Sequence, residues 1–206
     1  MSITIKQATA QDAPFLAQMI LQSSRAGKKE GFFDLLFGTS DSSVILPFLE
    51  KLTQTEAKNR CHYKNFLIAS VDGNSVGSLC SYEPRIATHE TFVSALHEIG
   101  CEESEEALSI TLECDFRLNT RVIMFDFMEE VEGFIDVGIL KALMQKSLLS
   151  ARLKGYTIAQ TIIEIGSLEN QLFYKKLGFK VIAQKECELY REKFGRSGFM
   201  LLSTEF

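Results

Sequence analysis

The chain has 206 residues, of which 46% are hydrophobic and 24% charged, and its formal net charge is −5. These values predict a single folded domain with a sizeable core and argue against intrinsic disorder. The negative charge argues against a nucleic-acid surface, which needs clustered Lys and Arg. No apolar run approaches the roughly 20 residues of a membrane span. The start, Met1 to Lys6, lacks a signal-peptide pattern, so we expect a cytoplasmic protein without membrane partners.

The five cysteines are widely spaced and contain no Cys-x-x-Cys pair, which favours buried thiols over zinc or redox chemistry. His89 and His97 also lack partners at ligand spacing, so no metal site is expected. Cys61 or Cys80 with a histidine remains an alternative as a hydrolytic nucleophile, although Cys61 and His62 are sequence neighbours rather than groups placed by separate elements.

The first third of the chain predicts a strand, a helix and a helical insertion. Ile3 to Gln7 alternate as a strand, and Thr9 to Asp12 has the pattern of a helix start. Residues 26–62 then contain two apolar helical patterns, at 32–37 and 41–52.

A β-hairpin follows this insertion. Residues 65–71 and 75–82 are rich in β-forming side chains and flank Asp72 and Gly73, which is a strong signal for a tight hairpin turn. Residues 86–118 insert further helix, and the acidic run from Glu102 to Glu106 within them indicates a solvated helix start.

The centre of the chain predicts a strand, a loop and a helix. Residues 121–130 form the central strand, residues 137–154 the helix that ends at Gly155, and residues 157–165 the next strand.

The segment from Ser167 to Phe179 predicts a short helix. Leu168, Leu172 and Phe173 fall at i, i+4 and i+5, which predicts one buried face. Ser167 can cap the start of this helix, and Gly178 can supply the left-handed turn that ends it. A strand follows at 179–183, then a polar segment, then a last strand at 198–203.

Three of these segments, in this order, resemble the GCN5-related N-acetyltransferase (GNAT) superfamily. They are the hairpin with Asp-Gly-x-x-Val-Gly, which has Gly77 at the usual glycine, the central strand with the helix after it, and the helix with Tyr174-x-x-x-Gly178-Phe179 that leads into a strand. The resemblance implies an α/β (α+β) fold: a mixed, mostly antiparallel central sheet of about seven strands flanked by helices. It implies one acetyltransferase-like domain over residues 1–206, with helical insertions at about 26–62 and 86–118.

The resemblance also implies a reaction: acetyl-CoA, as cosubstrate, gives its acetyl group by direct attack to an amine of unknown identity, on a small molecule or a peptide. Tyr174 would protonate the departing thiolate. Asp126 is the first candidate for the base, and Glu130 is the second. The implied acetyl-CoA contacts are Met128, Glu129 and Glu130 on the central strand, Val137, Gly138, Ile139 and Leu140 at the helix start, and Ser167, Asn170 and Tyr174 near the C-terminus. The backbone of residues 128–130 would bind the acetyl and pantetheine groups, and the amides of residues 137–140 would bind the pyrophosphate as an anion.

The sequence departs from the GNAT pattern at the phosphate loop. Only Gly138 matches there: Ile135 replaces an arginine or glutamine, and Leu140 replaces a glycine or alanine. Four acids also crowd this segment, namely Glu129, Glu130, Glu132 and Asp136, and like charges oppose phosphate binding. Ser167 and Asn170 replace the family's asparagine and alanine. The alternative is therefore a catalytically silent GNAT-like module that binds another small molecule or a protein partner.

Overall fold

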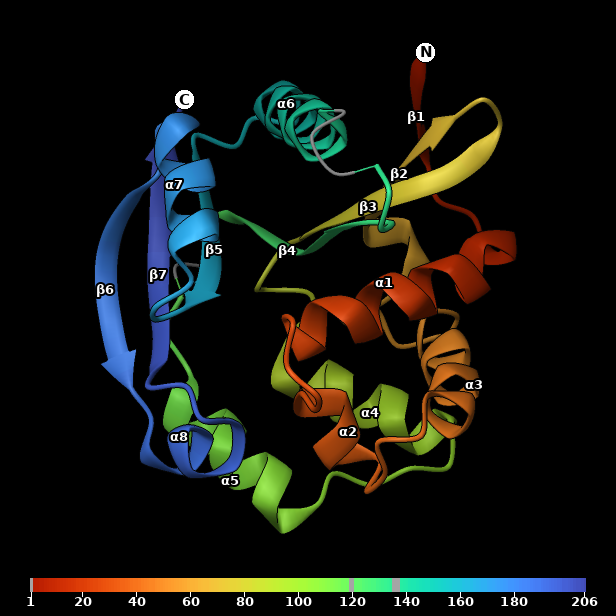
Figure 1. Ribbon diagram of the computed structural model, residues 1–206, viewed down its shortest axis with the longest axis vertical. Helices are drawn as coiled ribbons and strands as arrows, with labels where there is room; N and C mark the ends of the chain where they lie inside the picture. The colour runs from red at the N-terminus through yellow and green to blue at the C-terminus, as the bar shows by residue number, and fades with distance from the viewer. Residues whose placement is uncertain (1, 119–120, 135–137) are drawn as a thin grey trace.

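The computed structural model describes residues 2–118, 121–134 and 138–206, which form one seven-stranded sheet flanked by helices (Figure 1). The strands are β1 (Ile3–Gln7), β2 (Phe66–Val71), β3 (Asn74–Tyr82), β4 (Ile123–Glu130), β5 (Ile158–Glu164), β6 (Lys180–Glu186) and β7 (Gly198–Glu205). The helices are α1 (Ala13–Arg25), α2 (Phe32–Leu36), α3 (Ser42–Leu52), α4 (His89–Glu98), α5 (Glu105–Cys114), α6 (Ile139–Leu153), α7 (Leu168–Lys176) and α8 (Glu188–Phe194). Short 3₁₀ turns lie at Ala10–Asp12 and Tyr63–Asn65.

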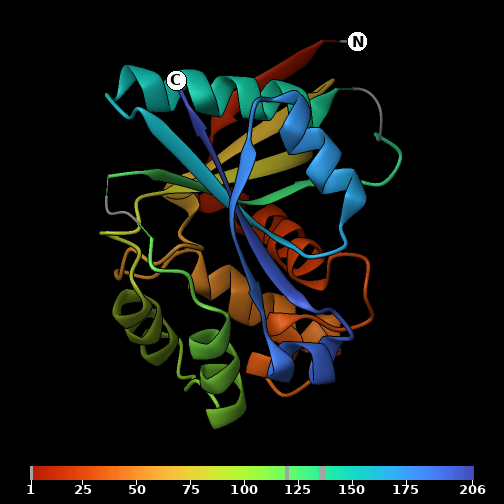
Figure 2. The same ribbon diagram turned by 90° about the vertical axis from the view of Figure 1, so that its left-hand side faces the viewer.

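The strands are ordered β1-β2-β3-β4-β5-β7-β6, and β4 and β5 are the one parallel pair among the described strands. The expected mixed, mostly antiparallel sheet is therefore confirmed. The parallel pair is short, since only Ile123, Met124 and Phe125 of β4 pair with β5. Beyond Phe125 the two strands separate, and Figure 2 shows them diverging.

Two hydrophobic clusters lie on opposite faces of the sheet. On one face α6 packs over β1 to β4 and buries Ile139, Leu143 and Met144, which share one side of the helix. On the other face α1 and the inserted helices α2, α3 and α4 pack together around Leu16, Ile20 and their neighbours. Figure 1 shows β4 running between these two layers, with α6 on one side and α1 on the other.

The predicted hairpin is confirmed. β2 and β3 pair antiparallel up to Val71 and Asn74, and the two residues between them have positive φ, 50° at Asp72 and 84° at Gly73. This is the conformation that a two-residue turn of matching twist requires. The two insertions are helical as expected, with α2 and α3 in the first and α4 and α5 in the second.

The predicted buried face of α7 is wrong at its two leucines, whereas Phe173 is partly buried against the cluster on the α6 side. Leu168 and Leu172 are 69% and 57% exposed, whereas Tyr174 is only 3% exposed. The Tyr174 ring packs edge-on against Phe173 and Phe179. The helix therefore faces the core with its aromatic side chains and not with its two leucines. Ser167 occupies the N-cap position without a side-chain hydrogen bond, and Gly178 has the expected positive φ of 89°.

The segment that we expected to be a polar connector contains α8. The first amides of this helix, at Glu188 and Leu189, donate to the carboxylate of Glu113 at 2.8 and 2.9 Å. Glu113 lies on α5, far away in sequence, so the local pattern could not show this cap. None of the described helices combines the length and the hydrophobicity that a membrane span requires.

Candidate functional site

A β-bulge in β4 determines which side chains of this strand point to the α1 face of the sheet and which to the α6 face. Phe127 has a φ of +45°, and the pairing with β3 shifts from Cys80 opposite Asp126 to Ser78 opposite Glu129. Two residues of β4 thus oppose one of β3, which breaks the normal alternation of side chains. Met124 and Phe127 both pack into the cluster on the α1 side, while Phe125 and Met128 pack on the α6 side.

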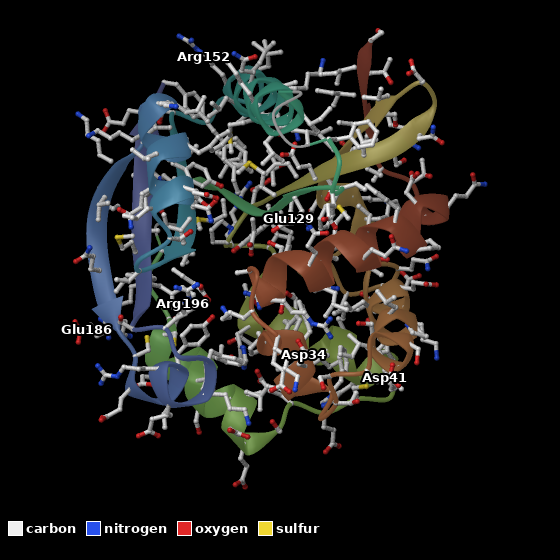
Figure 3. All side chains as sticks on the ribbon, in the orientation of Figure 1. Asp34, Asp41, Glu129, Arg152, Glu186 and Arg196 are labelled. Atoms are coloured by element: carbon white, nitrogen blue, oxygen red, sulfur yellow. The ribbon has the colours of Figure 1, made fainter. Side chains whose placement is uncertain are left out.

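The bulge corrects one expectation about the catalytic face. The sequence predicts that Asp126 shares a face with Met124, Met128 and Glu130, but the bulge places Glu129 on this side instead. The Glu129 carboxylate accepts a hydrogen bond of 2.8 Å from Gln22 Nε2 on α1, and Figure 3 shows it between β4 and α1. The sequence predicts for Glu129 only a contact with acetyl-CoA through the strand, and names Asp126 and Glu130 as the candidate bases. No glycine or asparagine marks Phe127 as a positive-φ position, so the bulge has no sequence signal.

Tyr174 reaches the point at which β4 and β5 separate. Its hydroxyl oxygen lies 3.5 Å from Oγ1 of Thr161, the β5 residue paired with Phe125 in the last pair between the two strands. Burial raises the pKa of Tyr174 to about 12; the Thr161 contact lowers it, while the charges of Asp126 and Glu129 raise it further. Tyr174 therefore stays protonated at neutral pH and lies within electrostatic range of both carboxylates.

The two carboxylates differ in their surroundings. Burial raises the pKa of Glu129 to about 7, against the hydrogen bonds from Gln22 and Ser23, and the charge of Glu130 raises it further. Burial also raises the pKa of Asp126, while the charge of Arg60 and the Phe127 amide, which donates to Asp126 at 2.8 Å, oppose the shift. Glu129 thus titrates in the range that suits a general base.

The start of α6 offers unpaired backbone donors on the opposite face. Gly138 is the N-cap residue, with a φ of +87°, so it has no side chain to cap the helix, and no acidic residue lies in the first turn of α6. Gly77 of β3 lets this end approach closely, because a Cβ there would lie 2.7 Å from Cγ2 of Ile139. The free amides and the helix dipole suit an anion.

The remaining predicted site residues are placed as follows. The Glu130 carbonyl accepts a 3.1 Å hydrogen bond from Gln22, Met128 and Leu140 are partly buried, Ser167 is partly buried, and Asn170 is exposed on α7. Val137 lies outside the described residues, as do Ile135 and Asp136. Of the acids that crowd the loop in the sequence, Glu129 points to the α1 side, away from α6, and Glu132 is exposed.

A polar cluster joins the two parts of the sheet on the side of the inserted helices. Lys28, from the loop after α1, pairs with Glu164 at the end of β5 and lies 3.2 Å from the hydroxyl of Tyr190 on α8. Tyr190 also donates to Glu164, and Nε of Arg196 lies 3.5 Å from the same carboxylate (Figure 3). This cluster bridges the diverging halves across the gap between β4 and β5.

The alternative of a cysteine nucleophile is not supported by the geometry. Cys61 and Cys80 are buried, and burial raises the pKa of Cys61 to about 12 and that of Cys80 well above its usual value. Burial and the neighbouring lysines lower the pKa of His62 to about 4. Such thiols stay protonated and unreactive at neutral pH. Among the described residues, no three His, Cys, Asp or Glu side chains group as metal ligands.

No protein-family model and no curated protein sequence matches the chain. Several solved structures do. An N-acetyltransferase from Staphylococcus aureus Mu50 is 17% identical, with a TM-score of 0.69 and coverage of 98% of this chain and 100% of that one. A GCN5-related N-acetyltransferase from Kribbella flavida is 15% identical, with a TM-score of 0.61 and coverage of 99% and 98%. The structure of yncA from Salmonella typhimurium, solved with its cofactor acetyl-CoA, is 15% identical, with a TM-score of 0.59 and coverage of 100% and 94%.

The chain has the GNAT fold. This confirms the resemblance that the Tyr174 helix and the Asp72-Gly73 hairpin indicated, and it extends that resemblance to nearly the whole chain. In this GNAT fold Tyr174, from α7, lies where β4 and β5 diverge and within electrostatic range of Asp126 and Glu129, both on β4. A shared fold does not define chemistry, so the activity has to be argued from these side chains.

Proposed function

We propose that this chain is an N-acetyltransferase that moves an acetyl group from acetyl-CoA to an amine. The observation that carries the proposal is the position of the Tyr174 hydroxyl. It lies where β4 and β5 begin to separate, beside Thr161, and within electrostatic range of Asp126 and Glu129. An acid that stays protonated and a base that titrates near neutrality thus flank the same gap, which is the pairing that acyl transfer to an amine needs.

The chemistry follows from these groups. The neutral amine nitrogen attacks the thioester carbonyl carbon, the C–N bond forms, and the C–S bond breaks. The thiolate that leaves takes the proton of the Tyr174 hydroxyl. The nitrogen loses its proton to a carboxylate on the α1 side of β4, for which Glu129 is our first candidate because its pKa is about 7. Asp126 then interacts with the amine before the reaction.

Acetyl-CoA fits the opposite side of the gap. Beyond Phe125 the edge of β4 that faces β5 pairs with none of the described strands. Its backbone can therefore bind the acetyl carbonyl and the amides of pantetheine. The first amides of α6, from Gly138 onward, would bind the pyrophosphate. In this arrangement the cosubstrate depends on backbone groups, which need no particular side chains.

Two measurements test the proposal. Calorimetric titration with acetyl-CoA should show saturable binding, and a thiol-detection assay with a panel of primary amines should show CoA release that depends on the amine. Binding without turnover for any amine would favour the catalytically silent module. If neither acetyl-CoA nor CoA bound, the proposal would be wrong.

A further inference from the structure

Arg60 is a charged side chain inside the α1 side of the fold that the proposed reaction does not use. It lies in the segment between α3 and β2, and its guanidinium carbon is 5.8 Å from the ring centroid of Phe32 and 5.3 Å from that of Phe92. Phe32 belongs to α2 and Phe92 to α4, so both helical insertions contribute to this position. These two rings restrain the guanidinium, which also interacts with the Cys61 thiol and lowers its pKa against the larger effect of burial.

The surroundings of Arg60 are fixed by other contacts. Its carbonyl accepts hydrogen bonds from Asn65 Nδ2 and Cys80 Sγ, both at 3.2 Å. The α2 helix that carries Phe32 is held to α1 by Asp34, which accepts a 2.7 Å hydrogen bond from Arg25 (Figure 3). The position is therefore built from several elements and does not depend on one flexible side chain.

The charge of Arg60 has no direct ion-pair partner in the part of the chain that the structure describes. No carboxylate oxygen of those residues lies within 4.0 Å of its nitrogens, and its Nε is buried without a hydrogen-bond partner. Buried donors are normally paired, so an unpaired one calls for a ligand or an ordered solvent molecule.

The nearest opposite charge is that of Asp126, which interacts with Arg60 at longer range. Asp126 raises the pKa of Arg60, and Arg60 lowers the pKa of Asp126. Burial is the largest effect on both pKa values and acts in the opposite direction in each case. Both residues nevertheless keep some exposed surface, so they are not fully enclosed in the core. A cation and an anion that interact without a direct ion pair complement a molecule that carries both charges.

We propose that the acetyl acceptor is a free amino acid, or a similar amino carboxylate, whose carboxylate binds Arg60 and whose amino group lies beside Asp126. This inference rests on the proposed function and names its substrate class. A guanidinium matches a carboxylate through two parallel hydrogen bonds. A simple amine would leave Arg60 unpaired, and a phosphate dianion would be repelled by Asp126. Phe32 and Phe92 beside the guanidinium favour an acceptor with an apolar or aromatic side chain.

The test compares acceptors that differ only in the carboxylate. CoA release is measured with phenylalanine, phenylalaninamide and phenethylamine, and with leucine and isoamylamine. We expect kcat/KM to be about 100-fold higher for each free amino acid than for its partner, because a site built for a polar group rejects analogues that lack it. Arg60→Gln should remove this preference by raising KM for the amino acids only, and Arg60→Lys should restore part of it.

Arg152→Gln is the matched control, because Arg152 is exposed on α6 and should leave the preference unchanged (Figure 3). Acetyl-CoA affinity, measured by calorimetry for every variant, reports whether the fold is intact, and Arg60→Lys covers the case in which Arg60→Gln does not fold. Turnover of the amines as efficient as that of the amino acids would overturn this inference and leave the acetyltransferase proposal standing. Absence of acetyl-CoA binding in the unaltered protein would overturn both.

Discussion

The two faces of β4 differ in the polar groups that they present to a ligand. On the α6 face, apolar side chains such as Phe125 and Leu143 pack between the sheet and α6. The polar groups that a ligand could contact there are the backbone amides at the start of α6. On the α1 face, the bulge at Phe127 places Glu129 on the same side as Asp126, so that two buried carboxylates lie there. A binding site formed by backbone groups keeps its function when the side chains change. A site formed by side chains is specific to the ligand that those side chains recognise. We therefore expect common cosubstrate chemistry on one face and acceptor selection on the other.

The largest effect that separates the faces should come from Tyr174→Phe. Tyr174 packs with the α6-side cluster, yet its hydroxyl meets the charges of the α1 side. Loss of the proton donor should lower kcat by about 100-fold in the thiol-release assay, with acetyl-CoA affinity unchanged. Tyr156→Phe is the control, since Tyr156 packs against the same cluster outside the gap and should keep full activity. Full activity of Tyr174→Phe would remove the tyrosine from the mechanism.

Gly77→Ala tests the α6 face alone. The added Cβ would meet Ile139 Cγ2 at 2.7 Å and the Glu129 carbonyl oxygen at 3.0 Å. We expect a loss of about 1–3 kcal/mol in the free energy of unfolding and weaker acetyl-CoA binding, because the start of α6 must move. Denaturant titration and calorimetry measure the two effects.

The control for Gly77→Ala is a second substitution that removes the Ile139 side-chain atom which the new Cβ would meet. The double variant with Ile139→Ala removes the closest atom, so it should be more stable than the sum of the two single changes predicts. Strict additivity would mean that the close approach of α6 to β3 does not limit either property.

Glu129→Gln tests the α1 face through the pH dependence of thermal stability. The pKa of Glu129 is about 7 in the folded protein, above its ordinary value of 4.5, so the folded state favours the protonated form. The stability that this group contributes is fully present below pH 4.5 and is lost as pH rises through 7. The unaltered protein should thus lose thermal stability from pH 5 to 8, and Glu129→Gln should lose less.

The same substitution should change the rate profile. If Glu129 accepts the proton of the amine, kcat/KM rises through pH 7, and Glu129→Gln removes this step and lowers kcat/KM about tenfold at pH 8. Glu132→Gln, an exposed acid three residues further along the chain, should change neither profile. An unchanged step in Glu129→Gln would leave Asp126 as the candidate base.

Much of the fold could be predicted because its signals are local. The Asp72-Gly73 turn, the Gly178 helix end and the alternation of β2 and β3 each depend on a few adjacent residues. The helix α8 was missed because the cap that starts it is the carboxylate of Glu113, on another element. Interactions between distant segments leave no periodic pattern in the sequence.

The site could be predicted only in part for the same reason. Tyr174 and Gly138 were identified as candidates through short motifs. The side-chain role of Glu129 depends on a one-residue shift at Phe127, which reverses the faces of the residues after it. Arg60 was missed because its meaning comes from Phe32, Phe92 and Asp126, which lie on three other elements.

The smallest effect that we predict concerns the outer face of α7, where the sequence and the structure disagree. Leu172→Gln should change the free energy of unfolding by less than about 0.5 kcal/mol, because Leu172 is 57% exposed. Leu168→Gln, at 69% exposure, is the matched second variant and should behave alike. Denaturant titration checks both. A loss of about 2 kcal/mol in either would mean that this stripe is buried after all, as its spacing suggests. Tyr174 would then face away from the core, and the geometry that places its hydroxyl between the two faces of β4 would be lost.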